Sequence, residues 1–177
     1  MRLNKHQRHS ARNNILLGAH LMLSHPGAIY YTQGADRWEG IARRDRVVKG
    51  HYPRHGDCSS TVTWMLWNAL THALEDMAIG DIVNGLHWQA GNTETMMQHG
   101  KHISRCTIVG DCVFYGHTFA RRHVAIYIGN GYVFSHGSAG GPYKVNGRYR
   151  SDIVARRRYI LAPYINVGGI ASVISGV

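Results

Sequence analysis

One of the three cysteines in the sequence stands where a thiol can act as a nucleophile. Cys58 follows Asp57 and opens a segment in which apolar residues recur at helical spacing. The macrodipole and the unpaired backbone N–H groups at the start of a helix favour a negative partner. We therefore expect Asp57 to be the N-cap and the thiol pKa of Cys58 to be lowered. The same N–H groups can hold the oxyanion that forms when a thiolate attacks a carbonyl.

The other two cysteines have a different context. Cys112 lies in the apolar run 112–115, which is typical of a small buried thiol, and Cys106 has no catalytic surroundings. An odd count of cysteines, without an export signal, argues against a disulfide framework.

A thiol nucleophile needs an imidazole that takes its proton and returns it to the leaving group. Because the chain has thirteen histidines, only position can select one. His123 opens a strand-like segment and His136 ends the next one, and Gly129-Asn130-Gly131 between them predicts a tight hairpin. A hairpin brings such ends together, so the two rings can meet. His117 is the alternative base if the strand register differs.

The elements that must position these groups can be read from periodicity. Helices are expected over 10–23, from Asp57 or Cys58 to about 75, and over 93–99. Strands are expected over 112–115, 123–128, 132–136 and 158–164. Residues 35–56 are polar and aperiodic, which indicates a long surface loop. A helical half followed by an antiparallel half predicts an α+β fold.

Composition restricts the function classes. The 177 residues are 44% hydrophobic and 17% charged, as in a globular domain, and the chain has no apolar run that would span a membrane. The net charge is +10, which suits a polyanion or an anionic bacterial wall. Scattered cations without a recognisable module argue against nucleic acid as the primary ligand.

Metal and cofactor chemistry is not expected. A zinc site of Cys58 with His51 and His55 matches no established ligand spacing, and Trp64, Met65 and Trp67 read as core residues. The proposed chemistry needs no metal and no organic cofactor.

Three segments resemble motifs of the NlpC-type (NlpC/P60) papain-like peptidases, in the same order along the chain. Gly56-Asp57-Cys58-Ser59-Ser60-Thr61-Val62 resembles the segment that opens the catalytic helix of that family. The segments 110–115 and 123–131 are similar to the family's Gly-Asp-Leu-Val-Phe-Phe strand and its His-Val-Gly-Ile-Tyr-Ile-Gly-Asn-Gly hairpin. The resemblance covers roughly residues 12 to 160.

The resemblance implies roles for individual residues. It makes Cys58 the nucleophile, His123 the base, and Tyr31 a donor to the oxyanion, with Tyr30 as the alternative tyrosine. We expect His136 to be the third catalytic group, orienting His123. Asp57 and Ser59, on either side of the nucleophile, are expected to contact substrate.

The sequence departs from the family pattern at two places. Ser60 stands where the family usually has glycine. The family's third residue often falls twelve positions after the base, and Ser135 occupies that position while His136 is one residue further. A turn one residue longer would restore His136, whereas strict alternation would point His136 to the other face.

The resemblance implies a papain-like α+β fold, with N-terminal helices packed on a small antiparallel sheet and a groove between the Cys58 helix and the sheet. We expect one domain over 1–165, a loosely ordered tail over 166–177, and a monomer. The expected activity is hydrolysis of stem-peptide amides in bacterial peptidoglycan. Alternatives are an N-acetylmuramoyl-L-alanine amidase, an acyltransferase, or a non-catalytic wall or virion component.

A narrower likeness concerns the setting. Ser135-His136-Gly137, Gly141-Pro142 and 156–159 resemble peptidase domains of endolysins from phages of actinobacteria. With no signal peptide recognised, such an enzyme is expected to be made in the host cytoplasm and to reach the wall through a holin or as part of a virion.

Overall fold

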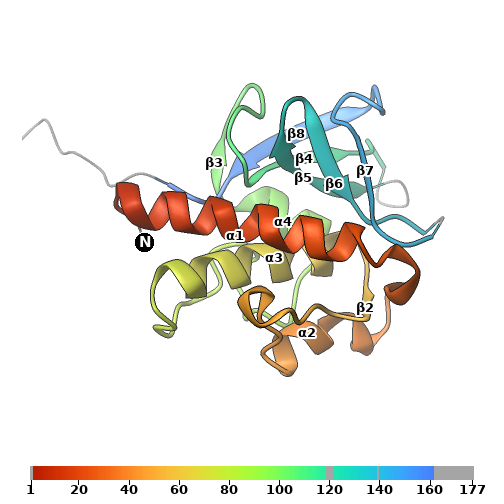
Figure 1. Cartoon of the computed structure of the whole chain (residues 1–177). Coiled ribbons are helices and arrows are strands. Elements are labelled where there is room, and N and C mark those ends of the chain that lie inside the picture. Colours follow the sequence, from red (N-terminus) through yellow and green to blue (C-terminus); the bar gives the residue numbers. More distant parts are fainter. Residues whose placement is uncertain (1, 119–121, 139, 162–177) are drawn as a thin grey trace, which may run out of the picture.

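The computed structural model describes residues 2–118, 122–138 and 140–161. These residues form two layers, a group of helices and an antiparallel sheet that covers one side of it (Figure 1). The expected α+β class is confirmed. The expected tail over 166–177 lies outside the described residues, as does the last part of the expected domain.

Helix α1 (Lys5–Leu23) begins earlier than periodicity predicts. Asn4 and Gln7 form a capping box, in which the Asn4 side chain accepts from the N–H of Gln7 and the Gln7 side chain accepts from the N–H of Asn4. The capping box moves the start upstream of Ser10, which we expected to be the N-cap. Along the rest of α1, Ile15 and Met22 are fully buried and face the core.

The segment between α1 and Cys58 is more ordered than a surface loop. It contains a two-stranded parallel pair and four short helical turns: η1 (Pro26–Ala28), β1 (Tyr30–Tyr31), η2 (Ala35–Trp38), α2 (Glu39–Ala42), η3 (Val47–Lys49) and β2 (His55–Gly56). Gly40 and Val47 are buried, and an added Cβ at Gly40 would lie 2.9 Å from the ring of Trp64. The expectation of an irregular loop over 35–56 is therefore wrong, because a few small or apolar residues anchor short turns without producing a period.

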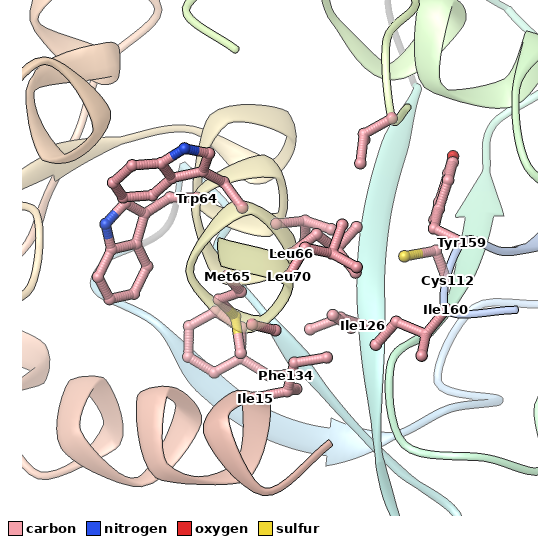
Figure 2. Packing of buried hydrophobic residues seen from close by; sticks show 14 of the residues in the cluster. Ile15, Trp64, Met65, Leu66, Leu70, Cys112, Ile126, Phe134, Tyr159 and Ile160 are labelled. Atoms are coloured by element: carbon pink, nitrogen blue, oxygen red, sulfur yellow. The ribbon is translucent and has the colours of Figure 1, made fainter. Parts of the chain in front are cut away.

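Helix α3 (Cys58–Ala73) is the centre of the molecule. All but one of its sixteen residues are buried. It packs against α1 on one side and β5 on another (Figure 1). Leu66 and Leu70 extend from this helix towards Ile126 of the sheet, whereas Trp64 points to the opposite side of the helix (Figure 2).

Helix α4 (Thr93–Gln98) lies within the segment 93–99 in which a short helix was expected. Its N-cap is Asn92, whose side chain accepts from two backbone N–H groups. Thr93 opens this helix and is buried.

The sheet has six strands in the order β3-β8-β4-β5-β6-β7, all paired antiparallel. They are β3 (Lys101–His102), β4 (Asp111–Tyr115), β5 (His123–Gly129), β6 (Tyr132–Ser135), β7 (Tyr143–Asn146) and β8 (Ile153–Arg158). The last strand therefore ends where the sequence suggested that it would begin. Three consecutive arginines in this strand obscure its alternation in the sequence. One of them, Arg158, pairs with the buried carboxylate of Asp111 at 2.6 Å.

The β5–β6 hairpin turns at Asn130 and Gly131, which both have positive φ (53° and 79°), as the sequence predicted. The register shifts between Tyr127 and Gly129, next to the turn. Beyond this irregularity the side chains alternate. Val124 and Phe134 face the helices, while Ala125 belongs to a second apolar cluster on the other side of the sheet.

No helix in the described ranges has both the length and the apolar character required to cross a membrane.

Candidate active site

Cys58 is the first residue of α3, and its side chain is buried at 7% exposure. Its Sγ atom lies 3.8 Å from the Oγ1 atom of Thr93. The backbone N–H groups of Val124 and Ser59 also face the sulfur and favour its anionic form. The thiol thus lies at the contact between the head of α3, the start of α4 and the start of β5.

The N-cap of α3 is held by a partly buried ion pair. Asp57 accepts from the N–H of Ser60 at 2.7 Å and from the hydroxyl of Ser59 at 2.9 Å. Its other oxygen accepts from Arg37 at 2.6 Å, and Arg37 also donates to the carbonyl of Gly91 at 3.1 Å. Ser60, which stands in place of a family glycine, completes the capping box by accepting from the N–H of Asp57.

Asp57 and Ser59, the two residues expected to contact substrate, are enclosed in this cap. Both side chains are buried, at 4% and 2% exposure, and they are hydrogen-bonded to each other. A carboxylate that caps a helix and pairs with an arginine has its lone pairs in use. The two residues fix the position of Cys58 through the cap.

His123 is the first residue of β5 and is 9% exposed. Its Nε2 atom lies 2.7 Å from the Oγ atom of Ser135. Its neighbour Val124 directs a backbone N–H at the Cys58 sulfur, and the charge of Asp57 acts on its ring. The start of β5 therefore lies at the head of α3, and Nδ1 is the ring nitrogen of His123 that Ser135 does not hold.

His136 takes a different place from the one expected. It faces α3, where its Nδ1 atom lies 3.0 Å from the Oγ1 atom of Thr61, and it is 1% exposed. Alternation along β6 explains the difference, because Phe134 and His136 point towards the helices and Ser135 points to the opposite side. Ser135, rather than His136, is the residue bonded to His123.

The two tyrosines of β1 are separated by their surroundings. Tyr31 is opposite Gly56 in the parallel pair and meets the ring of His136 edge-on at 5.7 Å. Burial raises the pKa of the Tyr31 phenol, and negative charge on Cys58 acts in the same direction. Tyr30 is 62% exposed and stacks on His55. Tyr31 is thus the tyrosine near the thiol.

Burial dominates the ionisation of the site. It raises the pKa of the Cys58 thiol, with a further contribution from the charge of Asp57. Burial lowers the pKa of His123 to about 4, assisted by the charges of Arg150 and His136, and lowers that of His136 to about 4. The lowered thiol pKa expected from the helix terminus is therefore not found, because desolvation of the sulfur outweighs the N–H groups around it.

The remaining candidates lie elsewhere. His117 is exposed, and its charge acts on Asp152. His55 pairs with Glu39. Among the residues that the structure describes, no three His, Cys, Asp or Glu side chains gather as metal ligands.

The hollow of about 750 Å³ beside the C-terminal half of α3 is lined by residues that include Arg46, Trp67 and Trp88. Cys58, His123 and Tyr31 do not line it. The groove expected between α3 and the sheet is therefore not this hollow.

Sequence reasoning did not find four residues of the site. Arg37 contacts Asp57, and Thr93 contacts Cys58. Tyr149 contacts Ser135, and the charge of Arg150 acts on His123. Thr93 and Tyr149 carry ordinary hydroxyl side chains and follow no spacing rule. The available clue was Ser135, which stands twelve residues after His123.

A central helix that opens with a buried cysteine, packed against an antiparallel sheet in which one strand opens with a histidine, is the arrangement of the papain-like class of α+β proteins. The chain belongs to the NlpC/P60 family, whose profile matches residues 37–156. No curated protein sequence matches the chain.

Solved structures share the fold. The peptidoglycan hydrolase RipB from Mycobacterium tuberculosis superposes with a TM-score of 0.54 at 19% identity, covering 92% of this chain and 70% of that one. NlpC2 from Trichomonas vaginalis gives 0.51 at 16% identity, covering 82% of this chain and 46% of that one. The chain thus spans less than half the length of NlpC2.

Proposed function

We propose that this protein is a peptidoglycan hydrolase that cuts an amide bond in the stem peptide, with Cys58 as nucleophile and His123 as general base. The observation that carries the proposal is the backbone N–H of Val124, the residue after His123 in β5, which faces the Cys58 sulfur at the head of α3. Two motifs that are far apart in the sequence meet at this point. Membership of the NlpC/P60 family supports the wall as the substrate.

The ionisation of the site indicates how the first step proceeds. With the pKa of His123 near 4 and that of Cys58 raised, thiol and imidazole are both neutral at rest. Nδ1 of His123 takes the thiol proton as the sulfur attacks the substrate carbonyl. The tetrahedral oxyanion is held by backbone N–H groups at the head of α3 and by the Tyr31 hydroxyl.

The same imidazole completes the reaction. His123 gives the proton to the departing amine, and an acyl thioester remains on Cys58. Water then attacks the thioester while His123 takes a proton from it, and the carboxylic acid leaves as the thiol is restored. His136, bonded to Thr61 and in contact with the edge of the Tyr31 ring, positions that tyrosine.

Purified peptidoglycan provides the direct test. Wild-type protein should reduce the turbidity of the wall suspension and release fragments with new amino and carboxyl ends in the stem peptide, identified by mass spectrometry. Cys58→Ala should release none, whereas Cys106→Ser should act like wild type, because Cys106 lies in the apolar cluster on the other side of the sheet. Equal release by wild type and Cys58→Ala would refute the thiol mechanism.

The same experiment separates the alternatives. Free lactyl-linked glycan with an intact stem peptide identifies an amidase, and a product extended by an added amine identifies an acyltransferase. A non-catalytic wall or virion component would bind wall without releasing fragments. A gel shift at physiological salt examines nucleic acid as a ligand of this basic chain.

We further propose that the protein acts as a phage endolysin on an actinobacterial wall, which its likeness to those peptidase domains over 135–137 and 156–159 supports. Expression in such a host should cause lysis only when a holin is supplied. Lysis without a holin would count against delivery through a pore.

We also propose that residues 1–165 act as a single monomeric domain, with a net charge of +10 that holds it near the anionic wall. Light scattering should return the mass of one chain. Sedimentation with wall should weaken as salt is raised.

A further inference from the structure

The hydrogen bond between His123 and Ser135 continues to a second hydroxyl. The Oγ atom of Ser135 lies 2.7 Å from Nε2 of His123 and 3.4 Å from the phenol oxygen of Tyr149. Ser135 is fully buried, so its hydroxyl can hydrogen-bond to these two partners but has no access to bulk water. A serine hydroxyl has one proton to donate and can accept on its oxygen.

This single proton couples the tautomer of His123 to Tyr149. If Ser135 donates to Tyr149, its oxygen accepts from Nε2–H of His123, and Nδ1 carries the lone pair. If Ser135 donates to Nε2 instead, the proton of the neutral ring is on Nδ1. Only the first arrangement leaves Nδ1 able to take a proton from Cys58.

Tyr149 is held as a partner by aromatic packing. Its ring meets Tyr115 edge-on at 5.2 Å and Tyr143 nearly perpendicular at 6.4 Å. Tyr115 is also the ring next to His123, at 6.2 Å. Burial raises the pKa of Tyr149 to about 12, so that it remains a neutral phenol wherever His123 works. The hydroxyl chain therefore carries no charge.

We propose that Tyr149 is a positioning residue that selects the Nε2–H tautomer of His123 by accepting the proton of Ser135. The choice of tautomer is a property of the resting protein alone, while its effect on the reaction rate rests on the proposed function. Two neutral hydroxyls orient the ring without stabilising an imidazolium, unlike a carboxylate in the same place. This agrees with a histidine that stays weakly basic.

Nitrogen-15 NMR of histidine-labelled protein tests the tautomer directly, because protonated and unprotonated ring nitrogens have well-separated shifts. At pH 7 wild-type His123 should show a protonated Nε2 and an unprotonated Nδ1. In Tyr149→Phe the phenol oxygen is lost, and the His123 signals should move towards the Nδ1–H form. Tyr132→Phe is the matched control, because Tyr132 is on the same hairpin as His123 but packs against Lys144. This variant should leave both signals unchanged.

The outcomes separate the two proposals. An Nδ1–H form in wild type, or an unchanged tautomer in a folded Tyr149→Phe, would overturn the role of Tyr149. If Tyr149→Phe does not fold, the wild-type tautomer decides by itself, and Ser135→Asp gives a second measurement, since a carboxylate there should raise the pKa of His123. On wall substrate, Tyr149→Phe should lower kcat roughly tenfold with KM unchanged. A tautomer change in a protein that cuts no wall would keep this inference and sink the proposed function.

Discussion

The Nε2 atom of His123 lies 2.7 Å from the Oγ atom of Ser135, so the imidazole is held from the side of the sheet that faces away from α3. The other histidine of the hairpin, His136, is on the opposite side and bonded to Thr61. One residue of register therefore decides which side chain holds the His123 ring. A neutral hydroxyl, rather than an ionisable ring, stands in that place.

The first prediction concerns the reactivity of Cys58. Because burial raises its pKa and His123 is neutral above a pH of about 4, the resting pair is uncharged. We expect iodoacetamide labelling of Cys58 to rise continuously with pH, beyond the ordinary range of a thiol. Peptide mass spectrometry at each pH measures the rate, with Cys106→Ser to remove the half-buried thiol. A fast, flat labelling rate between pH 5 and 7 would show a preformed thiolate instead.

The second prediction concerns the basicity of His123. After burial, the charge of Arg150 is the largest cause of its lowered pKa. Arg150→Gln should therefore raise that pKa, and the acidic limb of kcat/KM should move to higher pH. The exposed Arg148→Gln variant, two residues away, is the matched control. An acidic limb that does not differ between the two variants would exclude the influence of Arg150.

How far the sequence predicts this site depends on the range of the interactions. The N-cap at Asp57, the helix opened by Cys58 and the turn at Asn130 rest on local backbone chemistry, and all three are found. The likeness of 123–131 to a family motif is what singled out His123 among the histidines. Local rules are strong because each is satisfied within a few residues.

The rest depends on packing between distant segments. Arg37 reaches Asp57 across twenty residues of chain, and Tyr149 reaches Ser135 from beyond β7. No period or spacing encodes such contacts. The thiol pKa was misjudged for the same reason, since the helix terminus is visible in the sequence but the burial of Cys58 is not.

The third prediction concerns the anchor of the N-cap. Arg37→Gln leaves the buried carboxylate of Asp57 without its cation and removes a bond to Gly91. We expect the free energy of unfolding to fall by about 2–3 kcal/mol, measured by urea denaturation. Arg43→Gln breaks an ion pair whose arginine is 63% exposed and should cost less than about 0.5 kcal/mol. Equal losses would mean that the Arg37 pair contributes no more than a surface bridge.

The last prediction concerns stability in acid. His123 and His136 are buried and have pKa values near 4 in the folded chain, against about 6.5 when unfolded. Above pH 6.5 both histidines are neutral in the folded and in the unfolded chain, so they do not lower the free energy of unfolding. As the pH falls from 6.5 towards 4, the unfolded chain binds protons that the folded chain does not, so stability is lost in that window.

At pH 5 the loss is about 2 kcal/mol for each of the two histidines. His136→Gln keeps a polar side chain beside Thr61 and removes one of these titrations. Its free energy of unfolding should therefore fall less than that of wild type between pH 7.5 and 5, by about 2 kcal/mol. His20→Gln, on the exposed side of α1, controls for the substitution itself. Parallel pH dependences of wild type and His136→Gln would show that the pKa of His136 is the same in the folded and the unfolded chain.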